Sequence, residues 1–182
     1  MEYVQKASVM DEKAMERALT RISFEIIERN SGSEDLCILG IQRRGAVLAE
    51  RISKRLSEIE NREIPTGSLD VTHYRDDNAG KQLPSQNKSV LPCDISNKNV
   101  ILVDDVLYTG RTVRAAIDAV MAKGRPKRIQ LAVLIDRGHR ELPIRPDFIG
   151  KNVPTSKEEK ISVHVTEFDG ENKVSIITKG VR

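Results

Sequence analysis

Apolar residues recur at helical spacing near the start of the chain. The repeating positions are Met15, Leu19, Ile22 and Ile26. Intervals of three and four residues place them on one helix face, which we expect to point into a core. Asp11 can cap this helix by accepting backbone N–H bonds, and Met10 and Met15 occupy the positions of a hydrophobic staple. We predict a helix from Asp11 to about Arg29, ended by Asn30-Ser31-Gly32.

Three short apolar runs alternate with further helical patterns. The runs cover residues 36–39, 100–103 and 129–135, and helices are predicted after Gly45 and from Thr112 to Met121. This alternation is typical of an α/β fold with a central, mainly parallel sheet flanked by helices. Two more strands, residues 162–168 and 173–178, are predicted to close the chain as a hairpin.

Two stretches show neither the helical nor the strand period. Residues 74–99 are polar and contain Pro, and a loop longer than about 12–15 residues in a compact domain is usually a functional lid or disordered. A tolerated surface excursion is the alternative. A second irregular stretch covers residues 136–156.

Composition narrows the class of protein. The 182 residues, with a formal charge of +3, suit one domain spanning residues 1–182. No apolar run approaches the ~20 residues of a membrane span, and no secretory signal is visible, so we expect a cytoplasmic protein without a membrane partner. Cys37 and Cys93 are too few for a disulfide framework, and His73, His139 and His164 lack metal-ligand spacing.

The segment from residue 100 to residue 112 combines features that suit one ligand. A buried strand carries Asp104 and Asp105 to the edge of the sheet where ligands bind in α/β folds. The turn Thr109-Gly110-Arg111-Thr112 then precedes a helix, whose N-terminal N–H groups and dipole bind anions. Ribose 5-phosphate presents hydroxyls and a phosphate in that combination. By itself, an acidic pair after a strand is also compatible with a magnesium site or a solvated strand end.

This segment resembles the phosphoribosyl pyrophosphate (PRPP) signature of type I phosphoribosyltransferases. The matching residues are Val100, Ile101, Leu102, Val103, Asp104, Asp105, Val106, Leu107, Tyr108, Thr109, Gly110, Arg111 and Thr112. More narrowly, the chain resembles the family of bifunctional regulators that attenuate pyrimidine operons and act as uracil phosphoribosyltransferases. Residues 18–22, 74–77, 136–145 and 150–156 carry this closer match.

The resemblance implies a transferase that converts uracil and PRPP to UMP and pyrophosphate, with magnesium carried by PRPP and no metal bound directly by the protein. Asp104 and Asp105 would hold the ribose hydroxyls, and Thr109 to Thr112 would hold the 5-phosphate. Arg75 is the third candidate catalytic residue, on a flexible lid of about residues 72–97 that would close over PRPP.

The pyrophosphate loop would comprise Ile41, Gln42, Arg43, Arg44 and Gly45. Where this chain has Gln42-Arg43-Arg44, the family more often has Lys-Thr-Arg. A small hood, about residues 136–156, would cover the base, and the assigned base or nucleotide residues are Asp136, Arg137 and Val163.

The same resemblance implies RNA binding. Residues 123–151 hold eight Lys and Arg against three acids, a local charge of +5. In the family, a basic face of a homodimer or higher homo-oligomer binds a stem-loop of the operon mRNA in response to UMP or UTP. The corresponding residues are Arg17, Thr20, Arg21, His139, Arg140, Arg145 and Lys151. Phe24 stands where relatives often carry His.

Three functions remain open from the residues. They are an attenuator that also makes UMP, a phosphoribosyltransferase for another base without an RNA role, and a non-catalytic RNA-binding sensor of UMP or UTP. We expect Arg21→Ala and Arg140→Ala to weaken RNA binding and to spare UMP synthesis, because neither residue lies on the PRPP loops.

Overall fold

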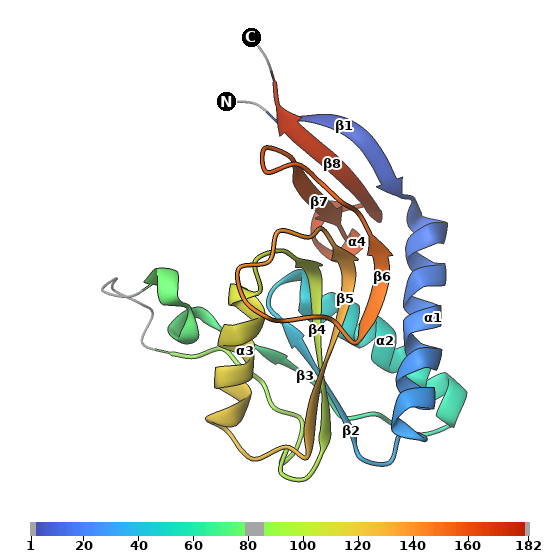
Figure 1. Ribbon diagram of the computed structural model, residues 1–182. Helices are drawn as coiled ribbons and strands as arrows, with labels where there is room; N and C mark the ends of the chain where they lie inside the picture. The colour runs from blue at the N-terminus through green and yellow to red at the C-terminus, as the bar shows by residue number, and fades with distance from the viewer. Residues whose placement is uncertain (1–2, 79–85, 181–182) are drawn as a thin grey trace.

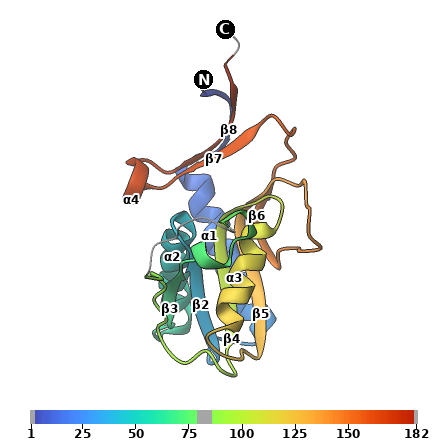
Figure 2. The ribbon, with the colours of Figure 1, turned by 90° about the vertical axis from the view of Figure 1, so that its left-hand side faces the viewer.

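In the computed structural model, which describes residues 3–78 and 86–180, five parallel strands form a main sheet in the order β3-β2-β4-β5-β6 (Figure 1). Their bounds are β2 Leu36–Ile41, β3 Thr66–Leu69, β4 Asn99–Leu107, β5 Arg128–Asp136 and β6 Phe148–Asn152. The helices α1 (Glu12–Asn30) and α2 (Arg44–Glu60) cover one face, and α3 (Arg111–Met121) covers the other (Figure 2). The predicted α/β class is confirmed.

A second sheet, which we call the terminal sheet, stands above the carboxyl ends of the main strands (Figure 1). Its antiparallel order is β1-β8-β7 among the described residues. The bounds are β1 Tyr3–Met10, β7 Lys160–His164 and β8 Lys173–Lys179, with the short helix α4 (Thr166–Asp169) between β7 and β8. The sheet thus pairs the first described strand with the last one.

The predicted first helix is confirmed with its Asp11 cap. The Asp11 carboxylate accepts a hydrogen bond from the Ala14 backbone N–H at 2.7 Å. Met10 and Met15 are buried, and Ser31 ends the helix in the left-handed conformation with φ of 55°. The helix α1 connects β1 of the terminal sheet to the lower end of the main sheet, where β2 begins.

Two hydrophobic cores lie on opposite faces of the main sheet. On one face Leu19 and Ile22 of α1 pack with Leu48 and Ile52 of α2, and all four are at most 1% exposed. The other core lies under α3 and includes the buried Val113. The strands between them are covered on both sides, which is why their sequences are continuous apolar runs.

Some strands differ from the sequence-based expectation. β1 and β3 were not predicted, and β6 lies inside the stretch 136–156 that was expected to be irregular. The closing hairpin is confirmed as β7 and β8, but residues 166–169 form α4 rather than strand. α4 exists because Asp169 accepts the Val165 N–H at 2.9 Å and Gly170 ends the helix at φ of 74°.

The predicted lid, residues 72–97, falls only partly within the structure, because residues 79–85 lie outside the described residues. Its described root forms two short 3-10 turns, η1 (Thr72–Tyr74) and η2 (Asp76–Asn78). Among the described helices, none is both long and apolar enough to cross a membrane.

Candidate active site

Two adjacent carboxylates lie near the carboxyl end of β4. Asp104 is 7% exposed and Asp105 is half-buried. Asp104 Oδ1 accepts the Asp105 N–H at 2.9 Å, and Asp105 Oδ1 accepts the Val106 N–H at 2.8 Å. Burial, together with the neighbouring Asp105 charge, raises the pKa of Asp104 well above its ordinary value. A ligand that brings hydroxyl donors or a cation would therefore bind favourably to Asp104, because either one stabilises the ionised carboxylate.

The turn before α3 is built to receive an anion. Gly110 is the N-cap of α3 at φ of 94°, a backbone conformation that glycine adopts readily. Gly110 has no side chain that could cap the helix, and the first turn of α3 contains no acidic residue. Thr109 Oγ1 accepts the Arg111 N–H at 3.3 Å, so the N–H groups of Thr112 and Val113 are the ones that remain for a ligand. Thr112 adds a hydroxyl, which accepts a hydrogen bond from Arg75 Nη1 at 3.1 Å.

Asp104 and the turn share one cavity of about 170 Å³. Its lining residues are Arg75, Asp104, Val106, Leu107, Tyr108, Thr109, Gly110, Arg111, Thr112 and Val113. The structure thus brings together Arg75 and most of the polar part of the PRPP signature. The earlier residues, Val100 to Val103, are buried in the sheet and hold this edge in place.

Cations next to the turn are already paired with acids from two directions. Arg75 binds Asp77 through contacts of 2.9 and 2.6 Å, and this partner raises the pKa of Arg75. Arg111 pairs with Asp76 of the lid root and, at 2.6 Å, with Glu141 of the 136–156 segment. The turn of residues 109–112, which we call the phosphate turn after its predicted ligand, is therefore linked both to the lid root and to the predicted hood.

The predicted pyrophosphate loop packs directly against the acidic pair. A Cβ on Gly45 would lie 2.5 Å from the Val103 carbonyl oxygen and 3.2 Å from Asp104 Cα, so only glycine allows this approach. The Gln42–Arg43 peptide bond is cis. Gln42 Nε2 donates to the Lys88 carbonyl at 3.1 Å, so this departure from the family pattern connects the loop to the returning end of the lid.

Sequence reasoning missed Asp70, which fastens both ends of the predicted lid. Its carboxylate accepts hydrogen bonds from the Thr72 N–H at 3.0 Å and the Lys88 N–H at 3.2 Å. Burial raises the pKa of Asp70, but the Thr72 and Lys88 hydrogen bonds outweigh it and lower the pKa overall. The Asp70 N–H donates to Ser89 Oγ at 2.9 Å. A lone Asp after a short strand gave no signal of this role.

Arg137, assigned to the base, is buried at 6% exposure and holds the 136–156 segment together. It donates to Thr155 Oγ1 at 3.0 Å and to the Glu159 carbonyl at 2.8 Å, and its guanidinium lies 4.0 Å from the Tyr108 ring centroid. A cavity of about 540 Å³ opens beside it. The lining residues are Asp136, Arg137, Gly138, His139, Arg140, Asn152, Pro154 and Thr155. Val163, by contrast, is packed in the hydrophobic core at 4% exposure.

Arg140 does not lie on the PRPP loops, as expected, but it contacts one of them. Its guanidinium donates to the Tyr108 carbonyl at 2.9 Å, the Ile144 carbonyl at 2.8 Å and Asp136 Oδ2 at 2.5 Å. Tyr108 belongs to the PRPP signature, so Arg140 supports that loop. Sequence separation hid the contact, since Arg140 and Tyr108 are 32 positions apart in the sequence.

The predicted RNA-binding residues lie on α1, on β6 and on the 136–156 segment. Arg21 donates to the Ile149 and Gly150 carbonyls at 3.0 and 2.6 Å, which places it next to Lys151 on β6. Lys151 Nζ donates to the Val9 carbonyl at 3.1 Å. Arg17 and Arg145 are exposed, and His139 and Arg140 line the 540 Å³ cavity.

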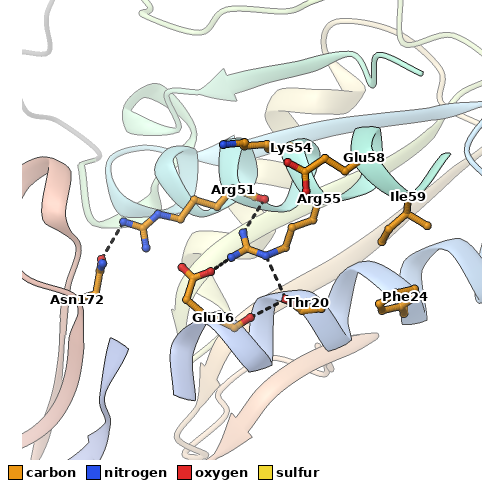
Figure 3. Close-up of a pocket in the computed structure, with 9 residues that line it drawn as sticks. All are labelled: Glu16, Thr20, Phe24, Arg51, Lys54, Arg55, Glu58, Ile59 and Asn172. Atoms are coloured by element: carbon orange, nitrogen blue, oxygen red, sulfur yellow. Dashed lines mark hydrogen bonds and ion pairs between the residues drawn. The ribbon is translucent and has the colours of Figure 1, made fainter. Parts of the chain in front are cut away.

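A groove of about 630 Å³ between α1 and α2 continues this surface (Figure 3). Thr20, Arg55 and Glu16 line the groove. Thr20 Oγ1 accepts a hydrogen bond from Arg55 Nε at 3.2 Å, and Arg55 also pairs with Glu16. Phe24 points into the groove and is 55% exposed. The groove therefore exposes an aromatic ring beside its charged side chains.

Within residues 3–78 and 86–180, no group of three or more His, Cys, Asp and Glu side chains is arranged to hold a metal ion. The adjacent Asp104 and Asp105 are the donors that a ligand-borne cation would meet. Oxygen ligands of this kind are the ones that magnesium prefers.

Comparison with known proteins places the chain in a family. Residues 6–167 match the phosphoribosyl transferase domain. The chain is 56% identical to the bifunctional protein PyrR of Acetivibrio thermocellus, over 98% of this chain and 99% of that protein. It is 58% identical to bifunctional protein PyrR of Clostridioides difficile, over 95% of this chain and 98% of that protein.

Solved structures of similar fold are purine enzymes by name. A hypoxanthine-guanine phosphoribosyltransferase of Bacillus anthracis aligns with a TM-score of 0.70 at 17% identity, covering 97% of this chain and all of that chain. The hypoxanthine phosphoribosyltransferase of Trypanosoma cruzi aligns with a TM-score of 0.72 at 13% identity, covering 97% and 98%. These likenesses establish the type I phosphoribosyltransferase fold, and the sequence identities establish the closer kinship. The chain belongs to the phosphoribosyltransferase domain family and, within it, to the bifunctional PyrR proteins.

Proposed function

We propose that this protein is a uracil phosphoribosyltransferase that also binds RNA and attenuates transcription of a pyrimidine operon. The observation that carries the enzymatic part is the shared cavity in which Asp104 lies beside the N-terminus of α3, whose first turn contains no acidic residue. Carboxylates accept the ribose hydroxyls, and the helix N-terminus binds the 5-phosphate. PRPP carries both groups at the required separation, together with a diphosphate that faces the loop 41–45.

In the reaction, the bond between ribose C1 and the diphosphate oxygen breaks, a bond from C1 to N1 of uracil forms, and the proton displaced from N1 is released to water. Asp104 and Asp105 bind the ribose and stabilise the positive charge that develops on it. Arg43, Arg44 and the α2 N-terminus bind the leaving diphosphate. Asp104 and Asp105 beside the loop would face a magnesium ion carried by the diphosphate, and that ion would neutralise part of the charge of the leaving group. No covalent nucleophile is needed.

The lid, residues 72–97, closes over PRPP and excludes water that would compete with uracil. Arg75, at the described root of the lid, joins it to the phosphate turn, since Arg75 Nη1 donates to Thr112 Oγ1 at 3.1 Å. The segment 136–156 reads the base with its backbone groups, and Asp136 and Arg137 hold that segment in shape. We assign all these parts to one domain, residues 1–182.

The regulatory function uses the basic surface of α1, β6 and the 136–156 segment. Arg17, Arg21 and Lys151 supply charge for RNA phosphates, whose contribution falls steeply with salt. We propose that two or more copies combine these surfaces to hold one operon mRNA stem-loop, and that the protein works in the cytoplasm. UMP and UTP are the proposed effectors.

The structure offers a route for nucleotide binding to affect RNA binding. The Leu107 carbonyl accepts the Arg137 N–H at 3.1 Å, and the Thr109 carbonyl accepts the Glu141 N–H at 2.9 Å. Arg111 adds an ion pair to Glu141. Because the phosphate turn is bonded to the segment that carries His139 and Arg140, a bound nucleotide phosphate orders part of the RNA surface.

One paired measurement tests both functions. Formation of UMP from uracil and PRPP is followed alongside RNA binding, with and without UMP. UMP formation with nucleotide-dependent RNA binding is the expected result. Product formation only from another base would favour a different transferase, and nucleotide-dependent RNA binding without any transfer would favour a non-catalytic sensor.

A further inference from the structure

The short helix α4 of the terminal sheet places three successive side chains on three arginines. Two of these arginines belong to the pyrophosphate loop, and the third lies further along α2. The contacts are Glu167 Oε2 to Arg51 Nη2 at 2.6 Å, the Phe168 ring centroid to Arg43 Cζ at 5.1 Å, and Asp169 Oδ1 to Arg44 Nη2 at 2.8 Å. These contacts therefore hold α4 of the terminal sheet against the loop and α2 of the main sheet.

Arg44 needs a counterion at its position. It is the first residue of α2, Arg43 is the N-cap, and the first turn contains no acid. A helix N-terminus carries a partial charge of about +0.5, which repels a guanidinium. Without an acid nearby, Arg44 would turn away from the helix end into solvent. Asp169 supplies that acid from the opposite sheet.

Asp169 is itself fixed. Its Oδ2 accepts the Val165 N–H at 2.9 Å, and its side chain is only 18% exposed. Burial raises the pKa of Asp169, but the Val165 and Arg44 hydrogen bonds lower it overall, so the carboxylate stays ionised. A fixed, charged carboxylate holds a guanidinium in one orientation, because the two planar groups meet along an edge.

The orientation leaves Arg44 ready for a second anion. Asp169 contacts Nε and Nη2 of Arg44, at 3.3 Å and at 2.8 and 3.1 Å. Nη1 thus keeps its two N–H groups for a ligand. Two guanidinium groups and the helix N-terminus carry about +2.5, and Asp169 removes one charge, so about +1.5 remains. The Asp169 carboxylate thus leaves positive charge that a polyanion such as a diphosphate can neutralise.

We propose that Asp169 is a positioning residue of the transferase, which holds Arg44 so that its remaining N–H groups bind the diphosphate of PRPP. The neighbouring Gly45 packs on Asp104, so a diphosphate held by Arg44 lies beside the carboxylates that bind the ribose. This inference rests on the proposed transferase function. It assigns Asp169 no contact with the substrate.

Steady-state kinetics of Asp169→Asn test the proposal. Asparagine keeps an oxygen for the Val165 N–H but loses the charge that holds Arg44. We expect the KM for PRPP to rise about tenfold, with kcat and the KM for uracil within about twofold of the parent. Arg44→Ala should raise the KM for PRPP at least as much, and the double variant should be no worse than Arg44→Ala alone.

The matched control is Glu167→Gln. It removes the adjacent ion pair of the same helix, to Arg51, which lies outside the loop. The KM for PRPP should stay at the parent value in this variant. Equal KM values in Asp169→Asn and Glu167→Gln would overturn the proposal. A lower KM in Asp169→Asn would also overturn it, because Asp169 would then compete with the diphosphate.

Calorimetric binding of PRPP with magnesium separates this inference from the proposed function. A parent that forms no UMP would contradict the proposed function, whatever Asp169 does. Tenfold weaker PRPP binding by a folded Asp169→Asn protein would still support the positioning role. Equal affinity in parent and variant, with matching thermal midpoints, would reject it.

Discussion

Replacing Arg140 by alanine tests whether the RNA surface and the PRPP loop share one support. The variant loses hydrogen bonds to the Ile144 and Tyr108 carbonyls and to the Asp136 carboxylate, at 2.8, 2.9 and 2.5 Å. It also leaves the Asp136 side chain, 13% exposed, without its cation. We therefore expect losses in stability, in UMP synthesis and in RNA binding together.

The size of the effect follows from these contacts. A hydrogen bond to a charged group contributes about 1.5–3 kcal/mol. The Arg140 side chain is 22% exposed, so water replaces part of what is lost and the three bonds do not add. We expect a net loss of about 2–3 kcal/mol in the free energy of unfolding. For a protein of this size, that lowers Tm by about 4–12 °C.

The assay compares Arg140→Ala with Arg145→Ala, from the same segment. Arg145 is exposed, so its replacement should weaken RNA binding and leave Tm unchanged. Thermal melts, UMP synthesis and RNA titration are measured on both variants. Full UMP synthesis at an unchanged Tm in Arg140→Ala would refute the reasoning, and Arg140 would then be a residue of the RNA surface alone.

Three further outcomes are expected. Asp105→Asn should lower kcat/KM for UMP synthesis at least tenfold with Tm nearly unchanged, and ordinary turnover would contradict its role at the ribose. Glu141→Gln, which removes the ion pair to Arg111, should reduce the tightening of RNA binding by UMP, and linkage requires an equal reduction in the effect of RNA on UMP affinity; titrations in both directions check this. Burial, then the nearby Cys93, raises the pKa of Cys37 from 9.0 to about 12, so iodoacetamide at pH 8 should modify Cys93 well before Cys37, as read by mass spectrometry. The folded state holds the Cys37 proton more tightly than the unfolded state does. The contribution of Cys37 to the free energy of unfolding is therefore complete below about pH 9 and is lost between pH 9 and about pH 12.

The parts of the fold that the sequence predicts are those with strong local signals. α1 has an N-cap, a staple and a repeating apolar face, and β2 and β4 are buried on both sides. β1 gives no such signal, because six of its eight residues are exposed and its side chains do not alternate between core and solvent. β3 and β6 are short strands at the two edges of the main sheet, where pairing rather than composition defines the strand.

The site divides in the same way. Asp104, Asp105 and the turn to Thr112 are contiguous, so their joint chemistry is visible in one short segment. Contacts between the main sheet and the terminal sheet are not visible in this way, since Arg44 and Asp169 are 125 residues apart in the sequence. No spacing rule relates them. Only the packing of the terminal sheet above the main sheet brings that carboxylate to the loop.

The pairing of β1 with β8 has a consequence for how the protein is made. On the ribosome, β1 emerges before the main sheet, but its register partner for Tyr3 is Lys179 of β8, which is made after the main sheet. The main sheet and its helices can form while β1 waits without a partner, since domains fold as their segments emerge. α4 gains its flanking strand only when β8 is complete. A nascent chain stalled before residue 173 would thus carry the ribose and phosphate residues of the main sheet, but not the finished sheet that presents Asp169 to Arg44.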